Sequence, residues 1–226
     1  MAGEDLSVCG RYTLYHDEQD LTELFALEAF AWAPRYNIAP TQVVPIVRER
    51  PDGVRERRDA RWGLVPVWVK EPAAFKNLLF NARAETVGEK PSFRDAARSA
   101  RCVVPASGFF EWRTEDGGKR PYYVHRRDGA PMAFAGLYAE RVRGEPACSV
   151  TVLTTEPNEL MATLHDRMPV VLERAQFARW LDPRKRDVAE LAELLHPCAS
   201  ELLEAYPVDR AVGNARVDEA RLVQRA

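Results

Sequence analysis

The chain has 226 residues, which is enough for one sizeable domain or two small ones. Its hydrophobic share of 46% and charged share of 29% are typical of a globular protein that dissolves in water. The formal net charge of −2 excludes a general electrostatic attraction to nucleic acid, so any anion site must come from local clusters of arginine.

The four cysteines predict neither a disulfide framework nor a metal site. They are Cys9, Cys102, Cys148 and Cys198, with no CxxC pair and no His/Cys spacing that fits zinc. Residues 1–8 are acidic and lack the apolar run of a secretory signal, and no segment approaches the ~18 apolar residues of a membrane helix. We therefore expect a reduced, cytoplasmic protein with no metal, no cofactor and no membrane association.

In chain order, the first half predicts short strands joined by turns. Residues 1–8 show no periodicity, so we expect a disordered extension. A β-prone run at 11–15 leads into a helix at 16–31, whose leucines recur at helical spacing, and then into a turn-rich loop at 35–42. The remaining elements of this half are strands at 43–49 and 54–62 around a Pro51-Asp52-Gly53 turn, an edge or extended segment at 63–68, and a helix at 92–99 capped by Ser92.

The second half continues the same pattern. Apolar runs and a hairpin turn at 115–118 predict strands at 101–105, 106–112, 121–125, 132–140, 148–154 and 169–172. Helical spacing predicts short helices at 158–164, 175–181, 188–195 and 200–206. Many strands joined by hairpins, with helices outside them, predict an α+β single domain over residues 9–226. Its core is a curved, largely antiparallel sheet or barrel flanked by helices.

Cys9 begins the segment Cys9-Gly10-Arg11-Tyr12 and has two possible chemistries. Inside a chain it offers only a thiol. At a true N-terminus it offers a thiol and an amine, and this pair captures an aldehyde as a five-membered thiazolidine ring. An N-terminal amine titrates near ~7.7–8, so a useful fraction is neutral at physiological pH. The alternative is a small buried hydrophobic residue near the end of the chain.

Three further side chains are candidates for catalysis. Glu111 lies between Phe110 and Trp112, where partial desolvation would raise its pKa toward the range of a general acid/base; the alternative is a solvated carboxylate on an alternating strand. His165 precedes a rigid Met-Pro turn and could transfer a proton, although a single histidine is more often structural. Asn81 could orient a carbonyl or amine, although turn residues are the commoner use of asparagine.

Arginines accompany these candidates. Arg11, Arg83 and Arg167 each fall within two residues of one of them, and three arginines from distant segments indicate an anionic substrate such as a phosphate backbone. Several aromatic residues could stack on bases or could belong to the core; these are Trp62, Trp68, Phe109 and Trp112.

Eight short blocks occur in one order between residue 9 and about residue 172. They are Cys9-Gly10-Arg11-Tyr12, Arg35-Tyr36-Asn37-Ile38-Ala39-Pro40-Thr41, Arg61-Trp62-Gly63-Leu64-Val65-Pro66, Asn81-Ala82-Arg83-Ala84-Glu85-Thr86, Cys102-Val103-Val104-Pro105, Gly108-Phe109-Phe110-Glu111-Trp112, Phe134-Ala135-Gly136-Leu137-Tyr138 and His165-Asp166-Arg167-Met168-Pro169. Each block alone is weak evidence, but eight in order are specific. With them the chain resembles the SOS-response-associated peptidase (SRAP) family, the abasic-site processing proteins.

The resemblance implies a fold and a function. Members of the family bind single-stranded DNA, and their N-terminal cysteine crosslinks to the ring-opened aldehyde of an abasic site as a reversible thiazolidine. The partner implied is therefore single-stranded DNA that contains abasic sites, with proteins of the replication fork as further partners. We expect a monomer that associates with the nucleoid when it is bound to DNA. The family is also described as having self-processing peptidase activity and a weak lyase activity.

The resemblance also assigns roles to matching positions. Cys9 would be the nucleophile, Asn81 would position the reacting amine and sugar, and Glu111 would be the acid/base. His165 would help to open the sugar and move its proton. Flanking phosphates would be held by Arg83, Arg167 and Arg11. Of the aromatic residues that could stack on bases, we expect Trp62 and Trp68 to contact the DNA.

One departure from the family pattern concerns the N-terminus. Members typically begin Met-Cys-Gly-Arg-Tyr, whereas residues 1–8 precede Cys9 here. Two routes would free the Cys9 amine: self-cleavage of the Val8–Cys9 bond, or a true start at a GTG codon that encodes Val8. We favour the second, since the arginine-rich composition suits a GC-rich genome. A second departure is that 212–216 fits the family's C-terminal motif only loosely.

Two other functions remain open at this stage. One is a noncatalytic module that binds single-stranded DNA, keeps the fold and lacks the free amine. The other is a cysteine peptidase that acts on other proteins through Cys9 and His165. The second lacks a recognisable peptidase motif and oxyanion loop.

Overall fold

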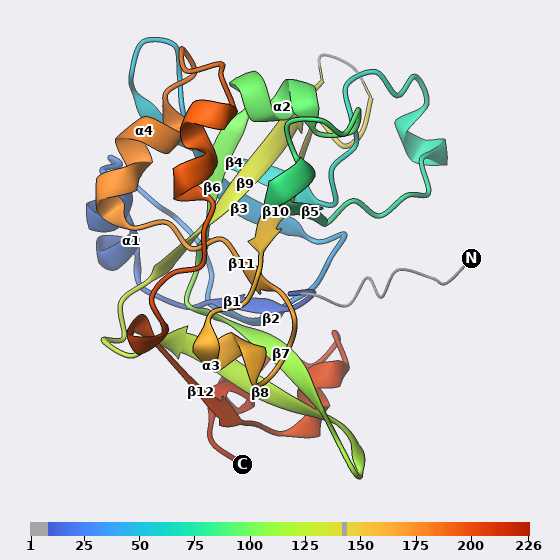
Figure 1. Ribbon diagram of the computed structural model, residues 1–226, viewed down its shortest axis with the longest axis vertical. Helices are drawn as coiled ribbons and strands as arrows, with labels where there is room; N and C mark the ends of the chain where they lie inside the picture. Colours follow the sequence, from blue (N-terminus) through green and yellow to red (C-terminus); the bar gives the residue numbers. More distant parts are fainter. Residues whose placement is uncertain (1–8, 142–143) are drawn as a thin grey trace.

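The computed structural model describes residues 9–141 and 144–226, and two β-sheets organise this part of the chain (Figure 1). The first sheet has five strands in the order β12-β8-β7-β1-β2. Its strands are β1 (Tyr12–Leu14), β2 (Arg35–Ile38), β7 (Gly108–Glu115), β8 (Gly118–Arg126) and β12 (Leu203–Pro207). All of its pairings are antiparallel, with β1 between β2 and β7.

The second sheet closes into a barrel. Strands β10, β4, β3, β6 and β9 follow one another, and β9 pairs with β10 to complete the ring. Two short strands, β5 and β11, lie against the far end of β10. The bounds are β3 (Val43–Glu49), β4 (Arg55–Trp62), β5 (Asn81–Arg83), β6 (Arg101–Ala106), β9 (Met132–Glu140), β10 (Cys148–Thr155) and β11 (Met168–Pro169). Among the strands of the described residues, only the pairings of β10 with β4 and β5 are parallel. The α+β fold with a curved, largely antiparallel, barrel-like core is confirmed.

The helices are short and lie outside the strands (Figure 1). α2 packs against β6 and β9, α4 against β6, and α3 against β12. The α-helices are α1 (Glu18–Phe25), α2 (Arg94–Ser99), α3 (Glu159–Ala162) and α4 (Phe177–Leu181). Turns of 3₁₀ helix occur at Pro72–Ala74, Ala84–Thr86, Arg174–Gln176, Ala189–Leu194, Ser200–Leu202, Arg210–Gly213 and Ala220–Val223. Within the described ranges, no helix is both long and apolar enough to cross a membrane.

Aromatic side chains join the two sheets. Tyr12 of β1 packs edge-on against Trp62 of β4 and Phe134 of β9, with ring centroids 5.2 and 6.1 Å apart. Trp62 in turn meets Phe80, which precedes β5, at 6.0 Å. Burial of each such side chain contributes about 1.5–3 kcal/mol. The start of β1 is therefore fixed against the barrel.

The outer face of the five-stranded sheet is covered by the end of the chain. Phe110 and Tyr123 form a second apolar cluster with Val208, Val212 and Leu222, all of them buried. Side chains of a strand alternate between faces, so Phe109 and Glu111 lie on the inner face and Phe110 on the outer one. This sheet is thus buried on both sides.

Gly108 shows why glycine begins the Gly-Phe-Phe-Glu-Trp segment. A Cβ atom at this position would lie 2.5 Å from the Tyr123 hydroxyl and 2.6 Å from the carbonyl oxygen of Val124. No larger residue fits without moving the β8 backbone. The glycine allows β7 to approach β8 closely just before Glu111.

Two predictions of secondary structure are wrong in kind. Residues 35–38 form strand β2 rather than a loop, because they pair with β1. Residues 203–207 form strand β12 rather than a helical turn, because they pair with β8 over their whole length. In both cases a tertiary partner decides the structure of a short segment whose own pattern is weak.

Three helix predictions are corrected in extent or type. The first helix ends at Phe25, because Ala26 takes a left-handed conformation (φ 55°) and closes it. The N-cap of α2 is Phe93 rather than Ser92, and it makes no side-chain cap bond. The helix predicted at 188–195 is of the 3₁₀ type, Ala189–Leu194. The extension predicted at residues 1–8 lies outside the described residues.

Candidate functional site

Cys9 and Glu111 form the buried centre of the site. Cys9 lies just before β1, is 1% exposed, and has a positive φ of 43°. Its backbone N–H donates to Glu111 Oε2 at 3.1 Å. β7 brings Glu111 there, because the Phe110 N–H donates to the Arg11 carbonyl at 2.9 Å and keeps β7 in register with β1. The two residues, 102 positions apart in the sequence, are thus adjacent.

Burial controls the protonation of both groups. It raises the pKa of the Glu111 carboxyl to about 7, although hydrogen bonds from the N–H groups of Cys9 and Trp112 act to lower it. The negative charge of Asp166 raises the pKa of Glu111 further. Burial, and then the charge of Glu111, raise the pKa of the Cys9 thiol well above its ordinary value. At neutral pH the carboxyl can therefore both give and take a proton, whereas the thiol stays protonated until a base acts on it.

Asn81 approaches this centre from the barrel. It begins β5, which pairs with β10 so that Asn81 stands opposite Val152. The preceding residue, Phe80, borders the Cys9 segment: a Cβ atom on Gly10 would lie 3.8 Å from the Phe80 ring. Asn81 is half-buried. The structure thus brings the segment of Phe80 and Asn81 beside the segment of Cys9 and Gly10.

His165 lies in the loop between α3 and β11. Its Nδ1 atom is 2.8 Å from Asp166 Oδ1 and 3.2 Å from the N–H of Arg167. A bare Nδ1 accepts the Arg167 N–H, whereas a protonated Nδ1 donates to Asp166. The imidazole is half-buried, with its side chain 16% exposed. Asp166 and Arg167 therefore fix the orientation of the ring through Nδ1.

Two of the three arginines expected at phosphates have internal partners. Arg167 makes a bidentate ion pair with Glu85, with N–O distances of 2.6 and 2.9 Å, and donates to the Thr154 carbonyl at 2.6 Å. Partial burial acts to raise the pKa of Glu85, but the hydrogen bonds from Arg167 lower it overall. Arg11 donates to Asn37 Oδ1 and to the carbonyls of Val212 and Gly213.

Arg83 differs from these two. It ends β5 opposite Thr154 and is exposed. The structure gives its guanidinium no hydrogen-bond acceptor among the described residues. Arg83 is therefore the one of the three arginines whose guanidinium could meet a phosphate without breaking a hydrogen bond to a described residue, and its charge also acts on Glu85.

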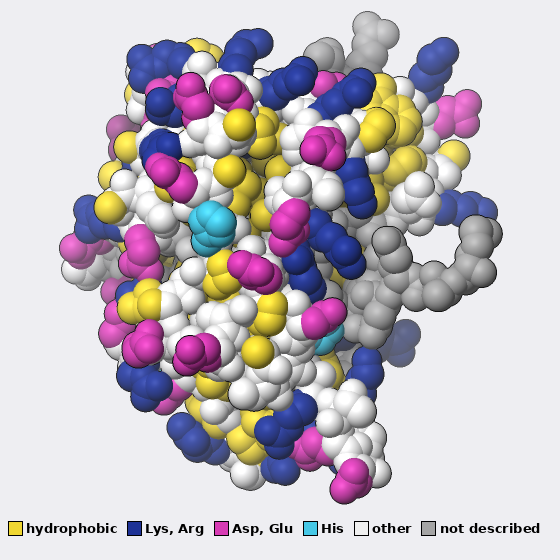
Figure 2. Space-filling view, in the orientation of Figure 1, with side chains coloured by type: hydrophobic (Ala, Val, Ile, Leu, Met, Phe, Trp, Pro, Cys, Tyr) yellow, Lys and Arg dark blue, Asp and Glu magenta, His cyan; other side chains and the backbone are white. Residues whose placement is uncertain are grey.

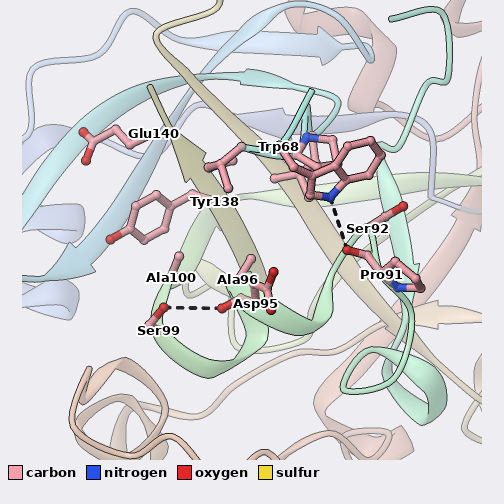
Figure 3. Close-up of a pocket in the computed structure, with 13 residues that line it drawn as sticks. Trp68, Pro91, Ser92, Asp95, Ala96, Ser99, Ala100, Tyr138 and Glu140 are labelled. Atoms are coloured by element: carbon pink, nitrogen blue, oxygen red, sulfur yellow. Dashed lines mark hydrogen bonds between the residues drawn. The ribbon is translucent and has the colours of Figure 1, made fainter. Parts of the chain in front are cut away.

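The two tryptophans expected at DNA differ in burial. Trp62 is 1% exposed, and its indole donates to the Phe80 carbonyl at 2.9 Å. It is a core residue, so the prediction that it contacts DNA is corrected. Trp68 is 55% exposed and overhangs a hollow of about 300 Å³ (Figure 3). Pro91, Tyr138 and Ser99 line the same hollow, and the Trp68 indole donates to the Pro91 carbonyl at 3.4 Å.

The molecular surface carries both signs of charge. Figure 2 shows Lys and Arg side chains interspersed with Asp and Glu over the visible face, and hydrophobic side chains gathered at the upper right. The exposed large apolar residues of the loop before β5 are Val67, Trp68 and Leu78. No group of three or more His, Cys, Asp and Glu among residues 9–141 and 144–226 could hold a metal ion.

Sequence reasoning missed the residues that hold the site together. These include Glu85, which pairs with Arg167, and Asn37, which accepts from Arg11. Both stand inside the ordered blocks, and Glu85 follows Arg83 by only two residues. Their position in those blocks was the available signal, but no local pattern reveals a partner 82 or 26 positions away.

Comparison with known proteins gives one consistent result. The family model described as SOS response associated peptidase (SRAP) matches residues 8–215. A Bacillus subtilis protein named abasic site processing protein YoqW is 39% identical over 96% of this chain and 99% of its own. The Escherichia coli abasic site processing protein YedK is 29% identical over the same shares. A crystal structure of a Bacteroides thetaiotaomicron protein superposes with a TM-score of 0.85 at 27% identity, covering 96% of this chain and 100% of that one.

Proposed function

Because the chain belongs to the SOS response associated peptidase (SRAP) family, we propose that it processes abasic sites in single-stranded DNA by forming a covalent crosslink through Cys9. The relatives named as abasic site processing proteins support the choice of substrate. The observation that carries the chemistry is the 3.1 Å contact between the Cys9 nitrogen and the Glu111 carboxylate. Such a crosslink shields the lesion from strand cleavage during the DNA damage response.

The reaction requires a Cys9 whose nitrogen is a primary amine. The amine adds to the sugar aldehyde, and the carbinolamine loses water to give an imine as Glu111 supplies a proton to the departing hydroxyl. The Cys9 thiol then adds to the imine carbon. Its proton passes to the Glu111 carboxylate, the imine nitrogen takes a proton, and a thiazolidine ring closes. Aldehyde and cysteine thus give thiazolidine and one water, and the same steps in reverse release the DNA.

The pKa values favour this order of events. Burial raises the pKa of the Cys9 thiol well above its ordinary value, so the sulfur is a poor nucleophile until a base removes its proton. Burial raises the pKa of Glu111 to about 7, so one carboxyl can act first as an acid and then as a base. Amine attack followed by thiol closure uses both properties.

The other residues act on the DNA. Asn81 orients the amine and the sugar, and His165 moves the proton that opens the sugar ring. Arg83 holds a flanking phosphate, and Trp68 stacks on an unpaired base. Arg167 reaches a phosphate only after it leaves Glu85, since the ion pair occupies its guanidinium. We infer a monomer that works at replication forks and near the nucleoid.

The free amine of Cys9 has to be produced. A start at the Val8 codon leaves a Met-Cys terminus that loses Met, and self-cleavage of the Val8–Cys9 bond would be the peptidase-type alternative. An imine that does not close can also undergo β-elimination, which would appear as a weak lyase activity. Intact mass of protein from the native host tests both routes, and a mature chain that retains residues 1–8 would contradict them.

A denaturing gel tests the crosslink. Protein that begins at Cys9 is mixed with an oligonucleotide that carries one abasic site, and we expect a heat-stable band of reduced mobility. The Cys9→Ala variant should lose this band and keep its affinity for undamaged single strands. A band that persists in Cys9→Ala would refute the thiazolidine. If the wild type binds but never crosslinks, the noncatalytic binding module becomes the better description.

A further inference from the structure

A buried polar junction joins the N-terminal strand to the end of the chain. Arg11 Nη1 donates to Asn37 Oδ1 at 3.1 Å and to the Val212 carbonyl at 3.2 Å. Asn37 is fully buried, with 0% exposure. Its Nδ2 donates to the carbonyls of Val212, Asn214 and Val217 at 3.2, 3.1 and 2.6 Å. One asparagine thus ties three backbone carbonyls to Arg11.

Further contacts extend this junction over the whole segment 208–223, which we term the C-terminal clasp. The Asp218 carboxylate accepts from the Tyr36 N–H at 2.5 Å and forms an ion pair with Arg35. Val212 and Leu222 pack on Phe110 at the outer face of β7. The C-terminal clasp therefore contacts β2 through polar groups and β7 through apolar side chains.

The clasp lies directly behind the reacting pair. Arg11 follows Cys9 by two residues, and Phe110 immediately precedes Glu111. The two strands meet where the Phe110 N–H donates to the Arg11 carbonyl at 2.9 Å. The clasp thus contacts both strands that carry the pair, on the face opposite to the pair itself.

A Cys9 with a free amine needs such support, because the first residues of a chain are poorly ordered unless they are tied down. Its nitrogen stays against Glu111 only while the segment that leads into β1 keeps its place. If the start of β1 loosened, the Cys9 nitrogen would leave Glu111.

We propose that Asn37 is a positioning residue: by joining Arg11 to the C-terminal clasp, it keeps the Cys9 nitrogen against Glu111. Arg11 accordingly serves this junction and is not a phosphate ligand. The catalytic consequence rests on the function proposed above, whereas the structural one does not. The competing interpretations are that the clasp only adds general stability and that Arg11 binds DNA.

Two variants and two controls separate these interpretations. Asn37→Ala removes the amide that joins Arg11 to the C-terminal clasp, and Arg11→Gln removes the guanidinium. Arg101→Met is the matched control for stability, because Arg101 likewise bonds three backbone carbonyls, those of Trp180, Ala97 and Asp182, at 2.5–2.7 Å. Arg101 begins β6, whereas β1 is bonded just beyond the other end of β6, where the Ser107 N–H donates to the Thr13 carbonyl. Arg83→Gln is the control for loss of a phosphate contact.

Three quantities are measured on chains that begin at Cys9. They are the crosslinking rate at saturating abasic DNA, the affinity for undamaged single strands at several salt concentrations, and hydrogen exchange of the peptide at 9–15. In Asn37→Ala we expect the rate to fall about tenfold or more and the exchange to speed up about tenfold, with affinity within about twofold of wild type. Arg101→Met should lower the melting temperature and change neither rate nor exchange.

Arg11→Gln should behave like Asn37→Ala, with an unchanged salt dependence. Arg83→Gln should instead reduce the slope of log affinity against log salt by about 0.7. If Asn37→Ala is poorly folded, Asp218→Ala serves in its place. It should slow crosslinking and speed the hydrogen exchange of 9–15 in the same direction, by smaller factors.

Each contrary result has a distinct meaning. Wild-type rate and exchange in Asn37→Ala would overturn the inference, and so would equal slowing by Arg101→Met. A reduced salt slope in Arg11→Gln would make Arg11 a phosphate ligand and would overturn its part in the junction. If the wild type itself does not crosslink, the proposed function fails, and the exchange of 9–15 still decides whether Asn37 holds β1.

Discussion

The two sheets supply different parts of the candidate site. The five-stranded sheet brings Cys9 and Glu111, both about 1% exposed, and the pKa of Glu111 is raised to about 7. The barrel brings Asn81, Arg83 and His165, which are exposed or half-buried. Burial brings the pKa of the Glu111 carboxyl into the range of an acid/base, whereas exposure leaves the charge of Arg83 in solvent. Under the proposed function, ring closure relies on the five-stranded sheet, whereas contact with the sugar and the phosphates relies on the side of the barrel.

Glu111→Gln should give the largest effect if this division holds. The amide keeps the shape of the carboxyl and cannot exchange a proton, so crosslinking at saturating DNA should slow by about 10²–10⁴-fold. Affinity for undamaged single strands should stay within about twofold of wild type. Single-turnover kinetics and fluorescence anisotropy measure the two quantities. Equal loss of rate and affinity would place Glu111 in the structural framework instead.

The two tryptophans should affect different quantities: Trp62 the stability of the fold, and Trp68 the affinity for DNA. Trp62→Ala should lower the free energy of unfolding by about 3–5 kcal/mol, because it empties a core site. Trp68→Ala should leave unfolding within about 0.5 kcal/mol of wild type and weaken binding of undamaged single strands by about 1–3 kcal/mol. Denaturant unfolding and anisotropy measure these quantities, with the exposed Val67→Ala as control. Unchanged binding in Trp68→Ala would remove the base-stacking role.

The buried carboxyl of Glu111 should also make the free energy of unfolding depend on pH. Its folded pKa of about 7 lies above its unfolded value, so the native state binds more protons between about pH 4.5 and 7. The free energy of unfolding should therefore fall as pH rises through this window, by roughly 3 kcal/mol for this group. Denaturant unfolding of wild type and Glu111→Gln at pH 5 and pH 8 isolates the effect. If the free energy of unfolding changes equally with pH in the two proteins, the pKa of Glu111 is not raised.

The smallest expected effect concerns the ion pair between Arg167 and Glu85 and the salt dependence of DNA affinity. Glu85→Gln should free Arg167 for phosphate, so the slope of log affinity against log salt should steepen by about 0.7. Glu89→Gln, also exposed and near by in sequence, is the control for simple loss of negative charge. Titration of undamaged single strands over several salt concentrations gives the slope. A slope shared by both variants would show that Arg167 does not move to DNA.

The sequence predicts the fold class well because the long strands have strong patterns. The strands at 43–49, 132–140 and 148–155 are largely continuous apolar runs, and the charged strand Arg55–Trp62 is predicted as the partner of the first through the Pro51-Asp52-Gly53 turn; together they form most of the barrel. β2 and β12 were missed because short segments follow their pairing partners more than their own residue types. Closure of the barrel through β9 and β10 depends on contacts that no local pattern encodes.

The sequence proposes members for the candidate site and does not reveal the contacts between them. The ordered blocks identify Cys9, Glu111, Asn81 and His165, and the structure places the segments of Asn81 and Cys9 together. The same blocks made Arg11 and Arg167 look alike as phosphate ligands. Whether an arginine faces DNA or an internal acceptor depends on residues far along the chain, as Val212 and Glu85 show.

Mass spectrometry of the crosslinked species tests the central claim most directly. After reaction of the chain that begins at Cys9 with abasic DNA, nuclease and trypsin should leave the sugar on the peptide Cys9-Gly10-Arg11, as an adduct formed with loss of one water. The chain that retains residues 1–8 should carry no adduct. An adduct on any other peptide, or on the extended chain, would contradict the role of the Cys9 amine beside Glu111.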